Sequence, residues 1–207
     1  MCPQTDIGWR IPFIKQLHER TASDVLLVAY RGYSDSEGTP TEEGLQRDAL
    51  AVLDWALEYK NRFSGKRLYV LGRSLGGAVT LFGATHHLER EQIDGLILEN
   101  TFTSIKDMVR VIFPFLVPFT GVLQRNFWPS KERIGEVGKP MLFLQSMKDE
   151  IVPPSQMQEL IERAGRASFK HIYQNRQGSH NANWEYNPEE YFHQYFQFFQ
   201  RVEGPTN

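Results

Sequence analysis

Residues 68–81, LYVLGRSLGGAVTL, decide the fold of this chain. An apolar run, a G-x-S-x-G turn and a run of small and apolar residues follow one another, which predicts a strand, a tight turn and a helix. Such a turn lifts the hydroxyl of Ser74 clear of the sheet, where it can act as a catalytic nucleophile. We expect side chains two positions before and after Ser74 to clash, so that Gly72 and Gly76 are both required.

Two further residues of this stretch have expected roles. Gly77 lets the helix pack closely against its neighbours. The backbone N–H of Leu75, at the N-terminus of the helix, is expected to face the negative charge that develops on a reacting carbonyl oxygen. The stretch therefore predicts a nucleophile, Ser74, and one donor to the oxyanion.

Short apolar runs alternate with longer amphipathic stretches along the rest of the chain. The short runs are continuous and rich in Val, Ile, Leu and Tyr, which is typical of strands buried on both faces. The alternation predicts one α/β domain over residues 1–207, with a mostly parallel sheet covered by helices on both faces. The five expected strands are Val25–Tyr30, Arg67–Leu71, Gly95–Leu98, Met141–Gln145 and Phe169–Tyr173.

Capping boxes predict the start of three helices, at residues 39–42 (TPTE), 155–158 (SQMQ) and 187–190 (NPEE). The first also carries proline at the first helical position. Leu45, Ala49, Leu53 and Leu57 follow the first box at a spacing that keeps them on one helix face. The aromatic residues after the third box are expected to pack onto the sheet: Tyr191, Phe192, Tyr195, Phe196, Phe198 and Phe199.

The composition argues against several classes of protein. A formal net charge of -2 gives no reason to expect nucleic acid as a partner. The single cysteine, Cys2, cannot form an internal disulfide and is expected to be a free thiol. Residues 1–10 contain no signal-peptide core, and the longest apolar run, Val111–Leu123, is shorter than the about 20 residues that span a membrane. No histidine, cysteine and carboxylate cluster has metal-ligand spacing, so we expect no metal and no other cofactor.

A serine hydroxyl is a weak nucleophile unless a base takes its proton and an acid orients that base. In chains with this turn the acid follows the serine, and the base comes last. Asp149 is the expected acid because it comes shortly after the strand Met141–Gln145. Glu150 and Glu99 are the alternatives, since each also follows a predicted strand.

His180 is the expected base, because it lies in a loop between the last predicted strand and the last helix. The other histidines fit less well, since they precede the first strand, end the helix after Ser74, or lie inside a strand or an aromatic helix. We expect these five to be surface or core residues: His18, His86, His87, His171 and His193.

Several segments together give the chain a family resemblance. They are residues 29–34 (AYRGYS), 36–38 (SEG), 72–78 (GRSLGGA), 99–104 (ENTFTS), 149–154 (DEIVPP) and 178–181 (GSHN). With these the chain resembles the α/β-hydrolase domain-containing protein 13 family, the bud-emergence-46-like serine hydrolases, from about Ile7 to the last helix. The resemblance implies an α/β-hydrolase fold and a triad of Ser74, Asp149 and His180, in agreement with the assignment above. Ala182 stands where relatives often carry an aspartate.

The start of the chain departs from the family pattern. Relatives have strands 1 to 3 and a His-Gly-Asn loop before a helix that Ile7-Gly8-Trp9-Arg10 matches. Met1–Asp6 occupies the position of that loop, which normally supplies a second oxyanion donor; losing one such donor costs roughly a hundred- to a thousandfold in rate. We therefore expect a relative that lacks the N-terminal strands 1 to 3. Val25–Tyr30 then becomes strand 4, separated from the next strand by an empty place in the sheet.

Three hypotheses follow. In the first, the chain is a serine hydrolase that cleaves an ester or thioester with a lipid-like acyl group, and Val111–Leu123 lies in a cap insertion at residues 105–135. In the second, it is a truncated, catalytically impaired isoform that acts as a binding or regulatory module. The third is an incomplete gene model. We expect a cytoplasmic or peripheral-membrane protein, because the sequence contains no signal peptide and no membrane-spanning run. The resemblance adds that full-length relatives often carry an N-terminal membrane anchor.

Overall fold

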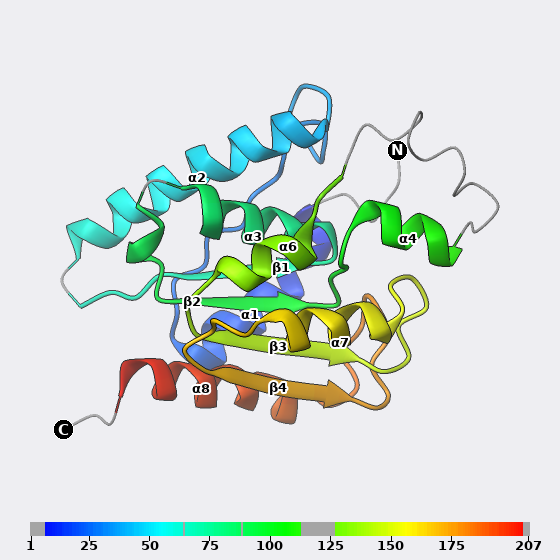
Figure 1. Ribbon diagram of the computed structural model, residues 1–207. Helices are drawn as coiled ribbons and strands as arrows, with labels where there is room; N and C mark the ends of the chain where they lie inside the picture. The colour runs from blue at the N-terminus through cyan, green and yellow to red at the C-terminus, as the bar shows by residue number, and fades with distance from the viewer. Residues whose placement is uncertain (1–6, 64, 88, 113–126, 205–207) are drawn as a thin grey trace.

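The structure is a computed structural model that describes residues 7–63, 65–87, 89–112 and 127–204. The described residues form one four-stranded sheet, in which all neighbouring strands are parallel (Figure 1). In chain order the strands are β1 (Tyr69–Arg73), β2 (Gly95–Glu99), β3 (Met141–Ser146) and β4 (Lys170–Asn175).

The strands lie in the sheet in the order in which they occur in the chain. Leu71 of β1 is paired with Ile97 of β2, which is paired with Leu142 of β3. Because parallel strands end at one edge, the segments that follow them meet there. This edge is where the sequence predicts the functional side chains.

Helices connect and cover the strands. In chain order they are η2 (Ile7–Arg10), α1 (Ile11–Thr21), α2 (Glu42–Arg62), α3 (Leu75–His86), η3 (Arg90–Gln92), α4 (Ile105–Ile112), α6 (Ser130–Arg133), η5 (Ile134–Glu136), α7 (Pro154–Arg163) and α8 (Pro188–Glu203).

Successive residues of the central strands point to opposite faces of the sheet, and a separate hydrophobic core lies on each face. Leu96, Leu98 and Phe143 pack with α3 and α7. Ile97 and Leu142 lie between them in sequence and pack with α1 and α8 on the other face. In Figure 1 α7 lies in front of the sheet and α1 behind it. The expected α/β fold, with helices on both faces, is confirmed.

Four of the five predicted strands are confirmed, with small differences at their ends. β1 begins and ends two residues later than expected, because Gly72 and Arg73 still pair with β2 although they are not apolar. β2 and β3 each extend by one polar residue, Glu99 and Ser146. β4 runs to Asn175. Polar residues thus end every strand at the functional edge.

The prediction of a strand at Val25–Tyr30 is wrong. This segment has no strand pairing, and none of its backbone N–H groups donates to another described residue. A cavity of about 1130 Å³ lies between it and β1, lined by residues of both segments. A strand requires a hydrogen-bonded neighbour as well as apolar side chains, and within the described residues Val25–Tyr30 has none.

The three predicted capping boxes have different outcomes. Asn187 caps α8 by accepting a hydrogen bond from the N–H of Glu190. α2 begins later than expected, and Thr41 rather than Thr39 caps it. The box at residues 155–158 is wrong, because α7 begins at Pro154 and its preceding residue, Pro153, has no side-chain acceptor to offer.

The expected apolar helix faces are confirmed. On α2 the four predicted residues, Leu45, Ala49, Leu53 and Leu57, are all buried. On α8 most of the aromatic residues belong to the core against the sheet, whereas Phe196 is 47% exposed.

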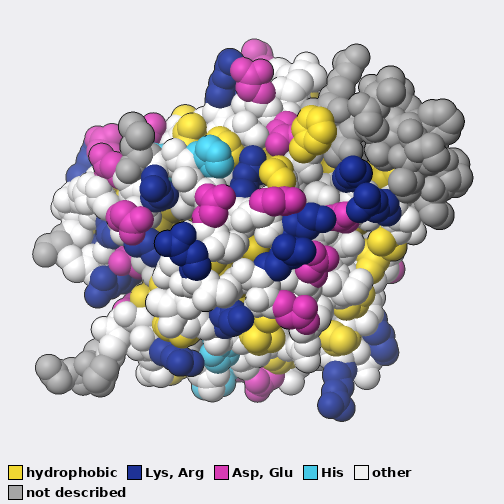
Figure 2. Space-filling view, viewed as in Figure 1, with side chains coloured by type: hydrophobic (Ala, Val, Ile, Leu, Met, Phe, Trp, Pro, Cys, Tyr) yellow, Lys and Arg dark blue, Asp and Glu magenta, His cyan; other side chains and the backbone are white. Residues whose placement is uncertain are grey.

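Basic and acidic side chains are interspersed on the face seen in Figure 2, in keeping with the small net charge. Among the helices that the structure describes, none is both long and apolar enough to cross a bilayer.

Candidate active site

Ser74 lies at the sharp turn between β1 and α3. Its backbone adopts φ 53° and ψ -121°, a conformation that L residues rarely adopt and that stores strain at functional sites. Two hydrogen bonds hold the turn: the Ser74 N–H donates to Glu99 O (3.0 Å), and Thr101 Oγ1 donates to Ser74 O (2.7 Å). The end of β2 therefore supports the turn.

The glycines around Ser74 differ in how much they are needed. A Cβ at position 72 would lie 2.3 Å from Gly76 O, so the requirement for Gly72 is confirmed. A Cβ at position 77 would lie 2.4 Å from Thr101 Oγ1, which confirms that Gly77 permits close packing. The expectation for Gly76 is wrong: the nearest atom to its added Cβ is the Tyr30 hydroxyl at 3.9 Å, an ordinary contact distance.

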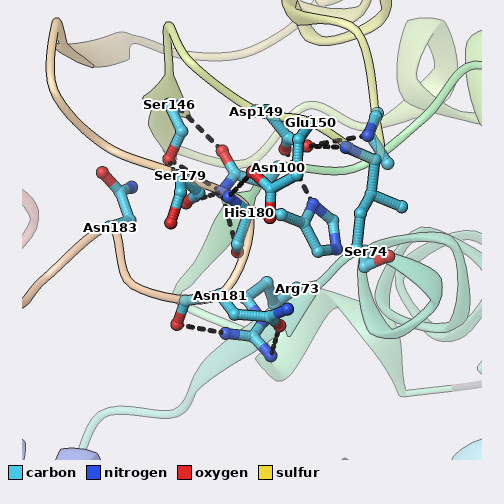
Figure 3. A network of polar contacts seen from close by, with 12 residues as sticks. Arg73, Ser74, Asn100, Ser146, Asp149, Glu150, Ser179, His180, Asn181 and Asn183 are labelled. Carbon is cyan, nitrogen blue, oxygen red and sulfur yellow. Dashed lines mark hydrogen bonds and ion pairs between the residues drawn. The ribbon is translucent and has the colours of Figure 1, made fainter.

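Asp149 and His180 are in contact. His180 Nδ1 lies 2.7 Å from Asp149 Oδ2, and the side chains are 5% and 1% exposed (Figure 3). The other carboxylate oxygen, Asp149 Oδ1, accepts the N–H groups of Ile151 (2.9 Å) and Val152 (2.7 Å). Both oxygens thus have partners, and these fix the carboxylate in the loop after β3.

Ser74 lies on the other side of the His180 ring. Both residues line the cavity beside β1, and in Figure 3 the Ser74 side chain lies on the side of the imidazole that faces away from Asp149. Within the described residues no hydrogen bond joins Ser74 Oγ to the ring. The three predicted residues therefore meet at the carboxyl edge of the sheet, with one contact formed and one open.

The alternative acids have other partners. Glu150 Oε2 accepts the backbone N–H of His180 at 3.1 Å, so it contacts the main chain rather than the ring. Glu99 is buried, and its Oε1 accepts hydrogen bonds from Asn183 Nδ2 and the Tyr191 hydroxyl, both at 3.0 Å. Burial raises the pKa of Glu99, an effect that the nearby positive charge of Arg73 opposes.

The remaining histidines have partners elsewhere. His171 contacts Gln194, His87 contacts Asp54, His18 contacts the Ser23 carbonyl, His86 stacks on Phe82, and His193 contacts Gln197.

Sequence reasoning missed the residue that joins the strands to the His180 loop. Asn100 follows β2 and has a φ of 44°. Its Nδ2 donates to Ser146 Oγ (2.9 Å) and His180 O (3.2 Å), while its Oδ1 accepts the Ser146 N–H (2.8 Å). Ser146 Oγ in turn donates to Ser179 O at 2.9 Å. The sequence signal that could have pointed to this residue is an asparagine directly after a buried strand, because asparagine tolerates a positive φ better than most residues do.

Further polar contacts hold the loop that carries His180. Arg73 donates to the carbonyl and the side-chain oxygen of Asn181, at 3.2 and 3.1 Å. Asn175 Nδ2 donates to Asn183 O at 2.7 Å. These contacts flank Ala182, the position where the family pattern has an aspartate. The loop is thus anchored on both sides of that position.

Leu75 is the first residue of α3, where backbone N–H groups have no acceptor within the helix. This geometry leaves its N–H available to an oxyanion. Met1–Asp6, which the resemblance places at the position of the second oxyanion loop but without its His-Gly-Asn, lies outside the described residues. Among the residues that the structure describes, no three His, Cys, Asp or Glu side chains lie close enough together to hold a metal ion.

Comparison with known proteins identifies the family of the chain. A family model described as "Alpha/beta hydrolase family" matches residues 5–194. The chain belongs to the alpha/beta hydrolase family. It is similar to an uncharacterized membrane protein of Saccharomyces cerevisiae, YNL320W, with 41% identity over 87% of this chain and 63% of that protein. It is also similar to the bem46 protein of Schizosaccharomyces pombe, with 38% identity over 80% of this chain and 54% of that protein. A third relative is WAV2 of Arabidopsis thaliana, with 33% identity over 95% of this chain and 67% of that protein.

These relatives place the chain among the bem46-like members of the family, as the resemblance implied. The chain spans between about half and two thirds of their length. Among solved structures, the Pyrococcus furiosus esterase Pf2001 has the same fold, with a TM-score of 0.70 at 19% identity over 93% of this chain and 75% of that one.

Proposed function

We propose that this hydrolase is a serine hydrolase that cleaves a carboxylic ester or thioester, with Ser74 as nucleophile, His180 as base and Asp149 as acid. The observation that carries the proposal is the 2.7 Å contact between His180 Nδ1 and Asp149 Oδ2, beside the strained backbone of Ser74. An imidazole held at one nitrogen by a buried carboxylate presents its other nitrogen to a hydroxyl.

The proposed reaction has two stages. In the first, His180 Nε2 takes the Ser74 proton, Ser74 Oγ attacks the acyl carbonyl, and the Leu75 N–H stabilises the resulting oxyanion. The imidazolium then protonates the leaving alcohol or thiol, which departs and leaves an acyl-enzyme. In the second, His180 takes a proton from water as the water oxygen attacks the acyl carbon. The imidazolium then returns that proton to Ser74 Oγ as the bond from Oγ to the acyl carbon breaks, and the carboxylic acid departs.

We also propose a cap at residues 105–135 and a lipid-like acyl substrate. α4 is held at its start by Asp107, which accepts hydrogen bonds from Ser104 Oγ and Lys131 Nζ (both 2.7 Å). These partners lower the pKa of Asp107 to about 2, against the effect of burial. Beyond this anchor Val111 and Ile112 are 52% and 45% exposed, which favours contact with an apolar ligand or with a membrane surface. Most of Val111–Leu123 lies outside the described residues.

A second candidate is a catalytically impaired binding module. One observation favours it: the cavity that contains Ser74 and His180 continues along the whole of β1, so the nucleophile is not enclosed in a small pocket.

The test is hydrolysis of nitrophenyl esters with acyl chains of increasing length. The serine hydrolase proposal predicts turnover that disappears in Ser74→Ala and persists in Ser155→Ala, an exposed serine of α7. A preference for longer chains would support the lipid-like substrate. Equal rates for the unchanged chain and Ser74→Ala would favour the binding module.

A further inference from the structure

Arg73 is the last residue of β1 and directly precedes Ser74, and its half-buried side chain reaches the loop that carries His180 (Figure 3). Its Nη1 group donates to the main-chain oxygen of Asn181 at 3.2 Å, and its Nη2 group donates to the side-chain Oδ1 of Asn181 at 3.1 Å. The residue before the proposed nucleophile therefore holds the residue after the proposed base.

This contact differs from the others that hold the loop. Among the described residues, no other hydrogen bond joins β1 or α3 to residues 178–183. The loop is otherwise held from the ends of β2, β3 and β4 and from the segment after β3. Those contacts involve Glu99, Asn100, Ser146, Lys148, Glu150 and Asn175. They fix the loop relative to Asp149, whereas the Arg73 contact ties it to the strand that ends at Ser74.

Arg73 spans the side of the proposed triad on which the contact is open. The His180 ring already meets Asp149, whereas no hydrogen bond joins the ring to Ser74 Oγ, although the structure describes both residues. The turn at Ser74 is itself held by Glu99 O and Thr101 Oγ1. The gap between hydroxyl and imidazole therefore depends on where the loop lies relative to the end of β1. A misplacement of about 1 Å can cost about a hundredfold in rate.

The two-point contact is specific to an arginine. A guanidinium presents its donors in a rigid planar fork that reaches two oxygens at once, whereas a lysine ammonium is a point charge on a flexible stem. Asn181 offers two oxygens to this fork, one from the main chain and one from the side chain. An exchange of arginine for lysine is not conservative at such a site.

Arg73 also lines the cavity that contains Ser74 and His180, so its charge could instead hold an anionic part of a substrate. The observed contacts favour positioning, because both terminal nitrogens of the guanidinium already donate to Asn181. Binding of a substrate anion would have to share or replace one of these acceptors.

We propose that Arg73 is a positioning residue, which sets the distance between Ser74 and His180 by holding Asn181 at two points. This inference rests on the proposed function, since it assigns a role within the same triad. Arg73 acts through the main chain of the residue next to His180, without touching the reacting atoms.

The test compares Arg73→Met, Arg73→Lys, Asn181→Ala and the double variant Arg73→Met with Asn181→Ala. A neutral and a negatively charged nitrophenyl ester give kcat and KM, a fluorophosphonate gives the rate of covalent labelling at Ser74, and urea unfolding gives the stability. The matched control is Lys60→Met, which removes a half-buried cation with two oxygen acceptors just before the start of β2, at the opposite edge of the sheet.

We expect Arg73→Met and Arg73→Lys to lower kcat and the labelling rate about tenfold to a hundredfold, with KM unchanged, because they displace the base rather than the ester. Asn181→Ala removes one of the two acceptors and should lose less. The double variant should be no slower than Arg73→Met alone, since both changes remove the same contact. Lys60→Met should lose stability and keep the kcat of the unchanged chain.

Full activity of Arg73→Lys would overturn the inference, because charge without the fork would then suffice. A rise in KM for the negatively charged ester, with kcat unchanged, would overturn it in favour of substrate binding by Arg73. A fall in kcat that Lys60→Met shares would overturn it in favour of a general loss of stability. If Arg73→Met does not fold, Asn181→Ala decides, and an unchanged kcat and labelling rate in that variant would overturn the inference.

The labelling rates separate this inference from the proposed function. Labelling of Ser74 at equal rates in the unchanged chain and in Arg73→Met would overturn the inference and leave the proposed function intact. An unlabelled Ser74 in the unchanged chain would overturn both.

Discussion

Asn100 Nδ2 lies 3.2 Å from the carbonyl oxygen of His180, so the end of β2 holds the main chain of the proposed base. The same side chain contacts Ser146 at the end of β3 through both its amide and its carbonyl group. One asparagine thus fixes the separation between two strand ends and the loop that carries the imidazole.

Replacing this asparagine tests its positioning role. Asn100→Asp keeps the size and the tolerance of positive φ, but it turns a carboxylate oxygen toward the His180 carbonyl. We expect kcat to fall about tenfold to a hundredfold with little change in KM, as displaced catalytic groups do. The added negative charge should also shift the acidic limb of the pH–rate profile to higher pH, because it favours the positively charged state of a nearby group.

The matched control is Asn61→Ala, at an exposed position on α2. A fall in kcat without any shift of the acidic limb of the pH–rate profile would show that Asn100 has only a structural role.

The two neighbouring carboxylates should differ in their importance. Asp149→Asn cannot hold the imidazole in the required tautomer, and in enzymes with such triads this change lowers kcat by about 10⁴-fold. Glu150→Gln keeps an oxygen that can accept the His180 N–H, so we expect a loss below about tenfold, comparable to one neutral hydrogen bond. Steady-state kinetics of both variants decide the assignment, and the reverse order of losses would make Glu150 the acid.

Buried Glu99 should make stability depend on pH. Its pKa is raised from the ordinary value of 4.5 by burial, so the folded protein binds this proton more tightly than the unfolded chain. The free energy of unfolding should therefore fall as pH rises from 4.5 through the raised pKa. Glu99→Gln has no proton to lose there, and its Oε1 can still accept from Asn183 and Tyr191. Urea unfolding should show a smaller decline with pH for the variant; parallel declines would contradict this role.

Two adjacent glycines of α3 should respond oppositely to alanine. Gly76→Ala meets no atom closer than 3.9 Å and should stabilise the helix, by about 0.5–1 kcal/mol. Gly77→Ala would press on Thr101 at 2.4 Å and should destabilise the protein by about 1–3 kcal/mol, as overpacked cores do. Thermal unfolding measures both, and a loss of stability in Gly76→Ala would restore the requirement that the turn pattern suggests.

The sequence predicts most of the fold because buried strands are continuous apolar runs. β2 and β3 are found within one residue, since Leu96 and Leu142 belong to runs that pack on both faces. Val25–Tyr30 is the exception because an apolar run reports burial and not pairing. Its side chains border a cavity, and the neighbour that would complete a ladder is not among the described residues.

The site is predicted in part for a similar reason. Asp149 and His180 are predicted because their order after Ser74 and their positions after strands leave few alternatives, and the structure brings the two side chains into contact. Asn100 and Ser146 were missed because single polar residues in loops have no periodic pattern. Their importance arises only when three strand ends are brought to one edge of the sheet.

The central claim is that Ser74 is a nucleophile activated by His180. The most direct measurement is labelling of the chain with a fluorophosphonate, followed by mass spectrometry of its peptides. The account predicts a covalent adduct on Ser74 in the unchanged chain and in Ser155→Ala, and no adduct in Ser74→Ala. An unlabelled Ser74 in the folded chain, or an adduct that persists on another serine in Ser74→Ala, would contradict it.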